Sequence, residues 1–422
     1  MEKDIYKTSR LLYIAEAALE YFISLIVSGA FLAKLTTAIG LSDGLTGILS
    51  ALVSLGCGFQ LIAVFLENKR PVKKWVCTLH IINQLFFGFV YFTPFLNINK
   101  TVKTVLFISF LVLAHAINNV VNAPKINWLM SLVDEGKRGT FTANKEIVSL
   151  VGGVVFSLSM SAVIDNFELN GNVESAFIVL GVTIFLITIL HTLSLLFSQE
   201  KQEQKIRTQT AKERLKEVIS DKTLFKVMLV SVIWSIAQYS TVPFYGTYQI
   251  KELGFSMLFV SLLTTIASLT RALVSRPIGR LGDKHSFVNM VSFCFLLEFI
   301  AFLINVFTVP RTGKYTYATY SILYALGMAG INSGSINLIY DYVDASRRVS
   351  ALAIKNTIAG ITGFFATLVM SLLVNKIQAN GNVFLGMHLY AQQVISFIGA
   401  IVVAIGLIYL NTVVKKIQKN RD

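Results

Sequence analysis

Apolar stretches close to the length of a membrane span recur along the whole chain, with short polar connections between them. About 20 apolar residues in a helix cross the hydrocarbon core of a bilayer, so each stretch predicts one transmembrane helix. A membrane barrel would instead show short segments of alternating polarity. The pattern predicts an all-α polytopic membrane protein with twelve spans, at 11–38, 44–66, 75–95, 104–132, 141–164, 176–198, 224–246, 256–280, 287–308, 315–340, 350–375 and 389–414.

A polar sequence in the first half of the chain returns in the second half. "VDEGKRGTFTANKE", from Val133 to Glu146, reappears as "VDASRRVSALAIKN", from Val343 to Asn356, and the match extends without a gap over Asn122–Val173 and Asn332–Val383. Polar identities at an offset of half the chain indicate a duplicated six-helix unit. Matching pairs include Asn122 and Asn332, Asp134 and Asp344, Arg138 and Arg348, and Lys145 and Lys355.

The duplication predicts how the chain is divided. An even number of spans in each copy makes both copies insert in the same direction, and parallel repeats of this kind hold a substrate between them near the middle of the membrane. We expect an N-terminal half over 1–198, a cytoplasmic linker over 199–223 and a C-terminal half over 224–422, around a central cavity. The linker carries charges of both signs and no aromatic residue, which is typical of a solvated connection.

Composition and charge agree with this architecture. Of 422 residues, 54% are hydrophobic and 14% are charged, against about 25% charged in soluble domains. The formal net charge of +14 comes mostly from basic residues in alternate connections, which indicates that these connections face the cytoplasm. Lys125 is assigned to one of them, together with Lys137 and Arg138. We expect both termini in the cytoplasm, a multi-pass location in the plasma (inner) membrane, and no nucleic-acid partner.

The sequence offers no pattern typical of an enzyme. Three cysteines, Cys57, Cys77 and Cys294, lie singly in apolar segments without metal-ligand spacing. No residue set resembles a hydrolytic triad, a metal cluster or a nucleotide-binding loop. We therefore expect neither catalysis nor a bound cofactor or metal.

Twelve spans, parallel six-helix halves and a basic central connection resemble the major facilitator superfamily of transporters. That superfamily carries the motif Gly-x-x-x-Asp-(Arg/Lys)-x-Gly-x-(Arg/Lys)-(Arg/Lys) after the second helix of each half. After the eighth span, "GRLGDKHSF" supplies Gly279, Asp283 and Lys284 of this motif. After the second span, "AVFLENKRPVKK" retains an acid, Glu67, and the basic pair Lys73–Lys74. The resemblance implies alternating access around a cavity lined by helices one, four, seven and ten.

Polar side chains at helical spacing mark one face of several spans. The candidates for substrate contact are Glu20 in the first span, His115, Asn118, Asn119 and Asn122 in the fourth, Trp234, Gln238 and Tyr245 in the seventh, Arg271 in the eighth and Asn332 in the tenth. Four of these five spans are the cavity-lining helices that the resemblance implies. The alternative is that the amides and hydroxyls hold neighbouring helices together by hydrogen bonds.

Charged residues inside predicted spans are candidates for function, because a buried charge without a partner is costly. Glu20 and Arg271 can pair with each other, or Arg271 can bind an anionic group of the solute while Glu20 takes a proton. Glu16 is a second candidate for proton coupling, at a shallower position near the membrane interface. His80 and His191 are interpreted as packing residues.

The repeated loops place an acid four residues before an arginine, as in Asp134 and Arg138, a spacing suited to an ion pair at a helix end. An exposed pair contributes under about 1 kcal/mol to stability. We therefore interpret the loops as a switch that biases an equilibrium between two states. The predicted cytoplasmic gate, including the positions that the resemblance adds, comprises Glu67, Asp134, Arg138, Asp283, Lys284, Asp344 and Arg348.

These features predict a secondary active transporter that moves a small polar or amphipathic solute by alternating access, with protons as the candidate coupling ion of a symport. Two alternatives stay open, namely proton-driven efflux of drug-like amphiphiles and a transporter-like sensor that moves nothing. The fifth span has Gly152–Gly153 where efflux members of the superfamily carry Gly-Pro, which counts against efflux. The expected partners are the solute, the lipid bilayer and protons, and we expect a monomer.

Overall fold

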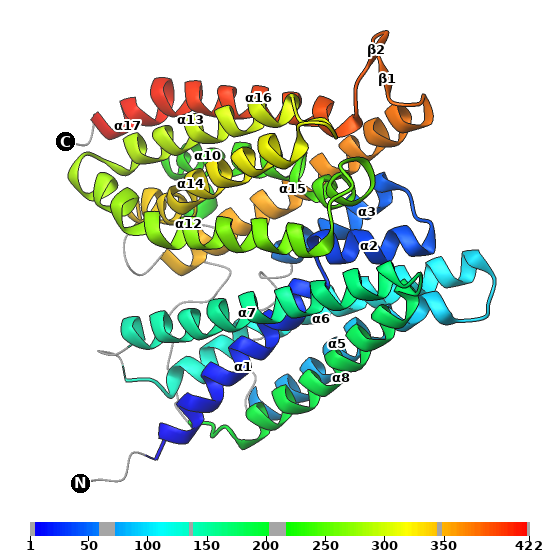
Figure 1. Ribbon diagram of the computed structural model, residues 1–422. Helices are drawn as coiled ribbons and strands as arrows, with labels where there is room; N and C mark the ends of the chain where they lie inside the picture. The colour runs from blue at the N-terminus through cyan, green and yellow to red at the C-terminus, as the bar shows by residue number, and fades with distance from the viewer. Residues whose placement is uncertain (1–4, 59–71, 135–137, 202–216, 344–347, 420–422) are drawn as a thin grey trace. The chain divides into compact units, whose positions relative to one another are not determined.

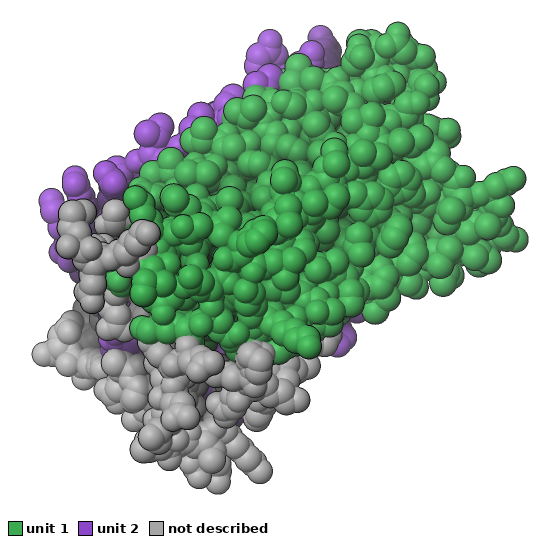
Figure 2. All heavy atoms as spheres, turned by 90° about the horizontal axis from the view of Figure 1, so that it is seen from below, with its two compact units in different colours: residues 1–41, 59–207, 256–261 green, residues 42–58, 208–255, 262–422 purple. Residues whose placement is uncertain are grey.

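The computed structural model describes residues 5–58, 72–134, 138–201, 217–343 and 348–419. Within these ranges the chain is almost entirely helical, as the apolar periodicity predicts (Figure 1). The contacts divide the chain into two units, which Figure 2 distinguishes by colour. The first unit comprises residues 1–41, 59–207 and 256–261, and the second comprises 42–58, 208–255 and 262–422.

The first unit is built from six described helices. Helices α5 and α8 lie side by side, and α1 packs against both α7 and α8 (Figure 1). The helices are α1 (Lys7–Ile26), α2 (Gly29–Ile39), α5 (Val72–Phe92), α6 (Lys100–Ser131), α7 (Arg138–Leu169) and α8 (Val173–Phe197), with the 3-10 turn η1 (Thr93–Phe95) after α5.

The second unit holds the remaining elements. Helix α13 packs between α14 and α16, and α15 packs against α10 and α3. The elements are α3 (Asp43–Ser50), α10 (Lys222–Tyr239), η3 (Val242–Phe244), α11 (Tyr245–Thr247), η4 (Tyr248–Glu252), α12 (Met257–Lys284, which begins in the first unit), α13 (Phe287–Val306), α14 (Gly313–Tyr340), α15 (Arg348–Ala379), β1 (Val383–Phe384), β2 (Met387–His388), α16 (Ala391–Tyr409), η5 (Leu410–Val414) and α17 (Lys415–Lys419). The two short strands pair antiparallel, with Val383 opposite His388.

Ten helices among the described residues are long and apolar enough to cross a membrane. The pair α1 and α2 forms an eleventh candidate, bent by 44°. The stretch Asp43–Gly58 is a shorter apolar helix that reaches the end of a described range. The chain is therefore a multi-pass membrane protein, and the full set of twelve spans stays a prediction.

The first predicted span, 11–38, is not one continuous helix. Helix α1 ends at Ile26, and Gly29 at the start of α2 has a φ of +54°, a left-handed conformation that favours glycine. The hydroxyl of Ser24 donates to the carbonyl of Tyr21, and that of Ser28 donates to the carbonyl of Ser24, both at 2.7 Å. Such bonds back to the helix backbone often accompany a bend.

Close helix contacts in each unit rest on glycines. A Cβ at Gly330 of α14 would lie 2.3 Å from the sulfur of Cys294 on α13, and one at Gly334 would lie 2.4 Å from a methyl carbon of Val291. A Cβ at Gly153 of α7 would lie 2.4 Å from the ring of Tyr21 on α1. Small residues let helices approach closely in a membrane, as the spacing of Gly330 and Gly334 predicts.

The predicted halves, 1–198 and 224–422, differ from the two units in two segments. Residues 42–58 group with the second unit because α3 packs against α15 and η3. Residues 256–261 group with the first unit, where the Asp165 carboxylate of α7 accepts hydrogen bonds from the backbone N–H groups of Met257 (2.8 Å) and Leu258 (2.7 Å). That carboxylate satisfies free donors at the N-terminus of α12.

Candidate functional site

The first unit contains a buried cluster of charged and imidazole side chains centred on Glu16 of α1. Glu16 is only 1% exposed, and its Oε1 atom lies 2.7 Å from Lys125 Nζ of α6 and 3.1 Å from His191 Nε2 of α8. Glu20 lies one turn further along α1 and also pairs with the Lys125 ammonium. The helices around α1 enclose Glu16, and its depth in the membrane stays a prediction.

Lys125 is the buried cation of this cluster, not a residue of a cytoplasmic connection. It is 1% exposed and lies inside α6, which continues through Pro124 to Ser131. The positive-inside count grouped Lys125 with the cytoplasmic basic residues, although the predicted span 104–132 includes it. The sequence signal that could have revealed Lys125 as a buried cation is the pair Glu16 and Glu20 in the first span, since two buried carboxylates need a nearby cation.

His80 of α5 has a defined hydrogen-bonding pattern in this cluster. Its Nε2 atom lies 3.0 Å from Lys125 Nζ, and its Nδ1 atom lies 3.0 Å from the amide oxygen of Asn83. A lysine ammonium can only donate, so Nε2 accepts and Nδ1–H donates to Asn83. The Asn83 amide in turn donates to the carbonyl of Ala114 at 3.2 Å. This arrangement holds His80 in its neutral form.

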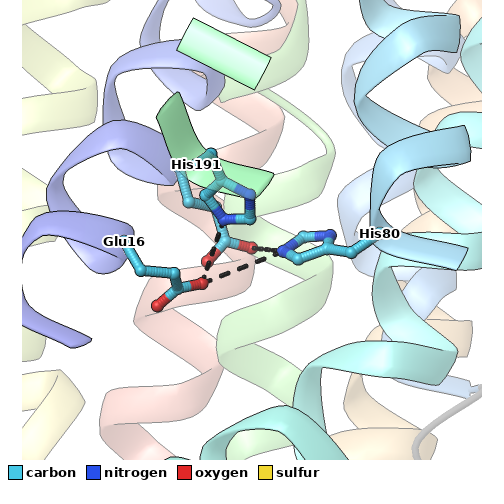
Figure 3. Close-up of side chains that lie close together, drawn as sticks. Glu16, His80 and His191 are labelled. Carbon is cyan, nitrogen blue, oxygen red and sulfur yellow. Dashed lines mark hydrogen bonds and ion pairs between the residues drawn. The ribbon is translucent and has the colours of Figure 1, made fainter. Parts of the chain in front are cut away.

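His191 of α8 approaches the same Glu16 oxygen as His80 does. Figure 3 shows Glu16, His80 and His191 converging from α1, α5 and α8. The two imidazole rings lie edge to face with their centroids 4.5 Å apart. Neither histidine is a simple packing residue, in contrast to the sequence interpretation, because both direct ring nitrogens at the charged groups.

The charges of the cluster do not balance without an added proton. Two ionised carboxylates and one lysine leave a net charge of −1 when both imidazoles are neutral. An unbalanced charge is costly in a site as enclosed as that of Glu16 and Lys125. One proton on the pair formed by Glu16 and His191 restores neutrality. Glu20, whose side chain is 23% exposed, is the member through which a proton can reach the others.

The cluster also has the ligand types of a metal site. One ligand atom from each of Glu16, Glu20, His80 and His191 lies within 4.8 Å of the others. Sequence spacing gave no sign of this set, because its members come from three separate helices. The Lys125 ammonium already contacts both carboxylates and His80, so a divalent ion would compete with it for these atoms.

The predicted contacts in the fourth span lie on α6. The His115 ring is buried and packs edge to face on Phe87 at 5.1 Å. Asn119 donates to the carbonyl of His115 in its own helix at 2.8 Å, and Asn122 is half-buried. The buried Asn118 side-chain oxygen has no hydrogen-bond partner among the described residues. Of these four predicted contact residues, Asn118 therefore has an acceptor that a solute could use.

The second unit contains a cavity of ≈ 160 Å³ with both apolar and polar lining residues, which brings together three of the predicted contact residues, Trp234, Gln238 and Asn332. Trp234 packs against Phe295 with ring centroids 5.7 Å apart, and Gln238 donates to the hydroxyl of Tyr324 at 3.1 Å. Other lining residues include Ser54, Cys57, Ser235, Ser335, Lys355 and Asn356. A rigid aromatic face beside amides and a cation is suited to a polar solute.

Two further predicted contact residues lie outside that cavity. The Tyr245 hydroxyl hydrogen-bonds to Ser396 Oγ at 2.7 Å, and its ring packs among other tyrosines. Arg271 is exposed on α12. Glu20 has Lys125 as an ion-pair partner within its own unit, and its suggested pairing with Arg271 stays a prediction.

The predicted gate is only partly described. Glu67 and Asp344 lie outside the described residues, as does the side chain of Arg138. Asp134 is exposed, with its carboxylate 3.9 Å from the Arg10 guanidinium of α1. Arg348 lies over the ring of Tyr340 at 4.7 Å. The remaining members, Asp283 and Lys284, are exposed at the end of α12.

Comparison with known proteins gives a family and a set of similar folds. A profile of the MFS/sugar transport protein family matches residues 69–375. No curated protein matches the chain significantly.

Several solved transporter structures have similar folds. A mutant of the nucleoside transporter NupG has a TM-score of 0.73 at 12% identity, over 95% of this chain and 98% of that one. The D-xylose-proton symporter has a TM-score of 0.69 at 14% sequence identity, over 96% of this chain and 97% of that one. A bacterial homologue of the iron transporter ferroportin, in its inward-facing state, also has a TM-score of 0.69 at 14% sequence identity, over 96% of this chain and 97% of that one.

Proposed function

Since the chain belongs to the MFS/sugar transport protein family, we propose that it is a secondary active transporter that moves a small polar solute by alternating access and is driven by protons. The family and the solved structures of similar fold are transporters, so the chain is a transporter and not an enzyme. Plasma-membrane location, cytoplasmic termini and a monomeric state belong to the same proposal.

The buried cluster around Glu16 is the observation that carries the proton-coupling part. Its carboxylates face a single ammonium, so one proton neutralises the site, and the half-buried Glu20 gives that proton a route. Protonation of Glu16 weakens its attraction to Lys125, which joins α1 to α6. A proton can shift a two-state equilibrium only by binding one state more tightly, and a site whose ion pair changes with protonation provides that difference.

The cavity of the second unit supports the solute-binding part of the proposal. Trp234, Gln238 and Asn332 offer an aromatic face, an amide donor and an amide acceptor from α10 and α14. Aromatic rings with nearby polar groups suit a sugar or another ring compound. D-xylose and uridine are the first solutes to test, because transporters of similar fold carry a pentose or nucleosides.

Transport into liposomes tests the proposal. Purified protein is reconstituted, and uptake of labelled D-xylose and uridine is measured with and without a pH gradient. Glu16→Gln is expected to abolish uptake driven by the gradient while exchange of labelled for unlabelled solute continues. Glu168→Gln is the control, because Glu168 pairs with Lys34 at an exposed position. Gradient-driven uptake by Glu16→Gln equal to that of the wild type refutes coupling through this cluster, and gradient-driven release in place of uptake favours efflux.

A divalent metal ion is a second candidate cargo, favoured by the ligand set of two glutamates and two histidines. Cobalt(II) titration of the purified protein tests it, because imidazole nitrogens change the visible spectrum of that ion. The metal hypothesis predicts a signal that is lost in His191→Ala and strengthened in Lys125→Ala. A flat titration in both the wild type and Lys125→Ala rejects it.

A further inference from the structure

Lys355 is a buried cation of the second unit. It lies in the second turn of α15 at the wall of the cavity lined by Trp234, Gln238 and Asn332, and it is 9% exposed. Its ammonium has a long contact of 3.5 Å to the hydroxyl of Ser335. No carboxylate among the described residues lies within ion-pair distance of it, and the Cys57 thiol is an ionisable group that interacts with it.

Lys125, the other buried lysine among the described residues, contacts the carboxylates of Glu16 and Glu20. Lys251, although exposed, also has an acidic partner, Asp43, at 2.5 Å. A lysine inside a membrane protein without such a partner is costly and indicates a function. Lys355 therefore differs from the lysines that stabilise the fold.

The internal repeat gives Lys355 a counterpart with a different environment. Lys145 occupies the equivalent position of the first copy. Its ammonium lies 4.9 Å from the centre of the Tyr13 ring and 3.4 Å from the Tyr13 hydroxyl, so an aromatic ring within the same unit stabilises it. Lys355 faces a cavity instead, beside two amides, Asn332 and Asn356, and the Trp234 ring.

We propose that this cavity binds an anionic group of the transported solute, with Lys355 as its counter-ion. The ammonium donates to a carboxylate or phosphate oxygen, the Ser335 hydroxyl and the amides of Asn332 and Asn356 donate to the remaining oxygens, and Trp234 packs on the adjoining carbon skeleton. The inference rests on the proposed transport function and narrows the solute to an acid such as a sugar acid or a sugar phosphate.

The size of the cavity agrees with this assignment. At ≈ 160 Å³ it is smaller than the pockets of about 300–1,000 Å³ that enclose a whole ligand. It therefore has room for one end of a solute. A charged end is the part that gains most from the lysine, because hydrogen bonds between two ions are about twice as strong as those between neutral groups.

Thermal stabilisation of the detergent-purified protein tests the inference with three matched probes, which are D-glucose, D-glucuronate and D-glucose 6-phosphate at equal ionic strength. The wild type is expected to bind one or both anions more tightly than glucose, and the stronger anion distinguishes a carboxylate from a phosphate. Lys355→Met is expected to weaken that binding by about tenfold to about a hundredfold. Lys355→Arg is expected to retain part of it, because the charge remains.

Two controls separate binding from folding. Lys376→Gln removes an exposed lysine from the same helix and is expected to bind the anions like the wild type. Ligand-free Lys355→Met is expected to melt at or above the wild-type temperature, because an unpaired buried charge has been removed. A lower melting temperature assigns Lys355 a structural role and overturns the inference.

Three further results overturn the inference. The wild type binds glucose and both anions equally, it binds none of the three, or Lys355→Met binds the anions as tightly as the wild type does. The assay needs no pH gradient, so failure here leaves proton-coupled transport of a neutral solute intact. Failure of transport in liposomes with anion binding retained refutes the proposed function instead.

Discussion

Removal of the Lys125 ammonium is the perturbation with the largest expected effect on the fold. Lys125→Met keeps the length of the side chain and leaves Glu16 and Glu20 without their cation. The ion pair between Lys125 and Glu16 spans 2.7 Å, which corresponds to an attraction of about 6 kcal/mol at an effective dielectric constant of about 20. Desolvation offsets part of this attraction, and breaking a buried pair typically costs about 3–5 kcal/mol.

Protonation of the remaining carboxylates sets the pH dependence of that loss. Among the described residues, Glu16 in the variant faces His80, His191 and the partly exposed Glu20, none of which is a fixed cation. The variant therefore takes up a proton more readily than the wild type. Its destabilisation is expected to be largest at alkaline pH and to shrink as the pH falls.

The assay is the thermal midpoint of purified variants across a range of pH, combined as a double-mutant cycle. Glu16→Gln in the Lys125→Met background is expected to recover most of the lost stability, because it removes the uncompensated carboxylate. Lys34→Met serves as control, since its partner Glu168 is exposed and the pair contributes about 1 kcal/mol or less. A Lys125→Met variant as stable as Lys34→Met at every pH refutes the description of the cluster.

Three further predictions concern other parts of the chain. Glu298 is fully buried, and neither of its carboxylate oxygens has a hydrogen-bond partner among the described residues. Glu298→Gln is therefore expected to melt within a few degrees of the wild type. A loss of several kcal/mol in the free energy of unfolding contradicts this. Gly330→Val pushes α14 from α13 and is expected to cost about 1–3 kcal/mol, whereas Gly279→Ala, with open space around its Cβ, has a small effect in the same melting assay. Asp43→Asn weakens the contacts of α3 with Lys251 (2.5 Å) and Gln378 (2.8 Å), so amide hydrogen exchange in 43–58 is expected to rise, and unchanged exchange contradicts that role.

The sequence predicts the helices and the family more fully than it predicts the site. Span-length apolar runs and the internal repeat carry the membrane architecture, because hydrophobicity is a local property of each segment. The break between α1 and α2 was missed because Ser28 and Gly29 interrupt an apolar run without ending it. Trp234, Gln238 and Asn332 were found from helical spacing and line one cavity.

The sequence indicated only the two acidic members of the charged cluster. Glu16 and Glu20 stand out because acids are rare in apolar spans. Their partners Lys125, His80 and His191 lie on three other helices, and no local pattern relates residues so distant in the chain. Partner choice in a helical bundle depends on tertiary packing, which is why Arg271 was considered for Glu20 in place of Lys125. The roles of these residues in coupling stay predictions.

Proton uptake coupled to solute movement tests the central claim most directly. Proteoliposomes in a lightly buffered suspension are given a transported solute, and the external pH is recorded in the absence of any imposed gradient. The wild type is expected to alkalinise the suspension in proportion to the solute taken up, and Glu16→Gln to take up solute by facilitated diffusion without a pH change. Equal alkalinisation by the two proteins, or solute uptake by the wild type with no pH change, contradicts coupling through the Glu16 cluster.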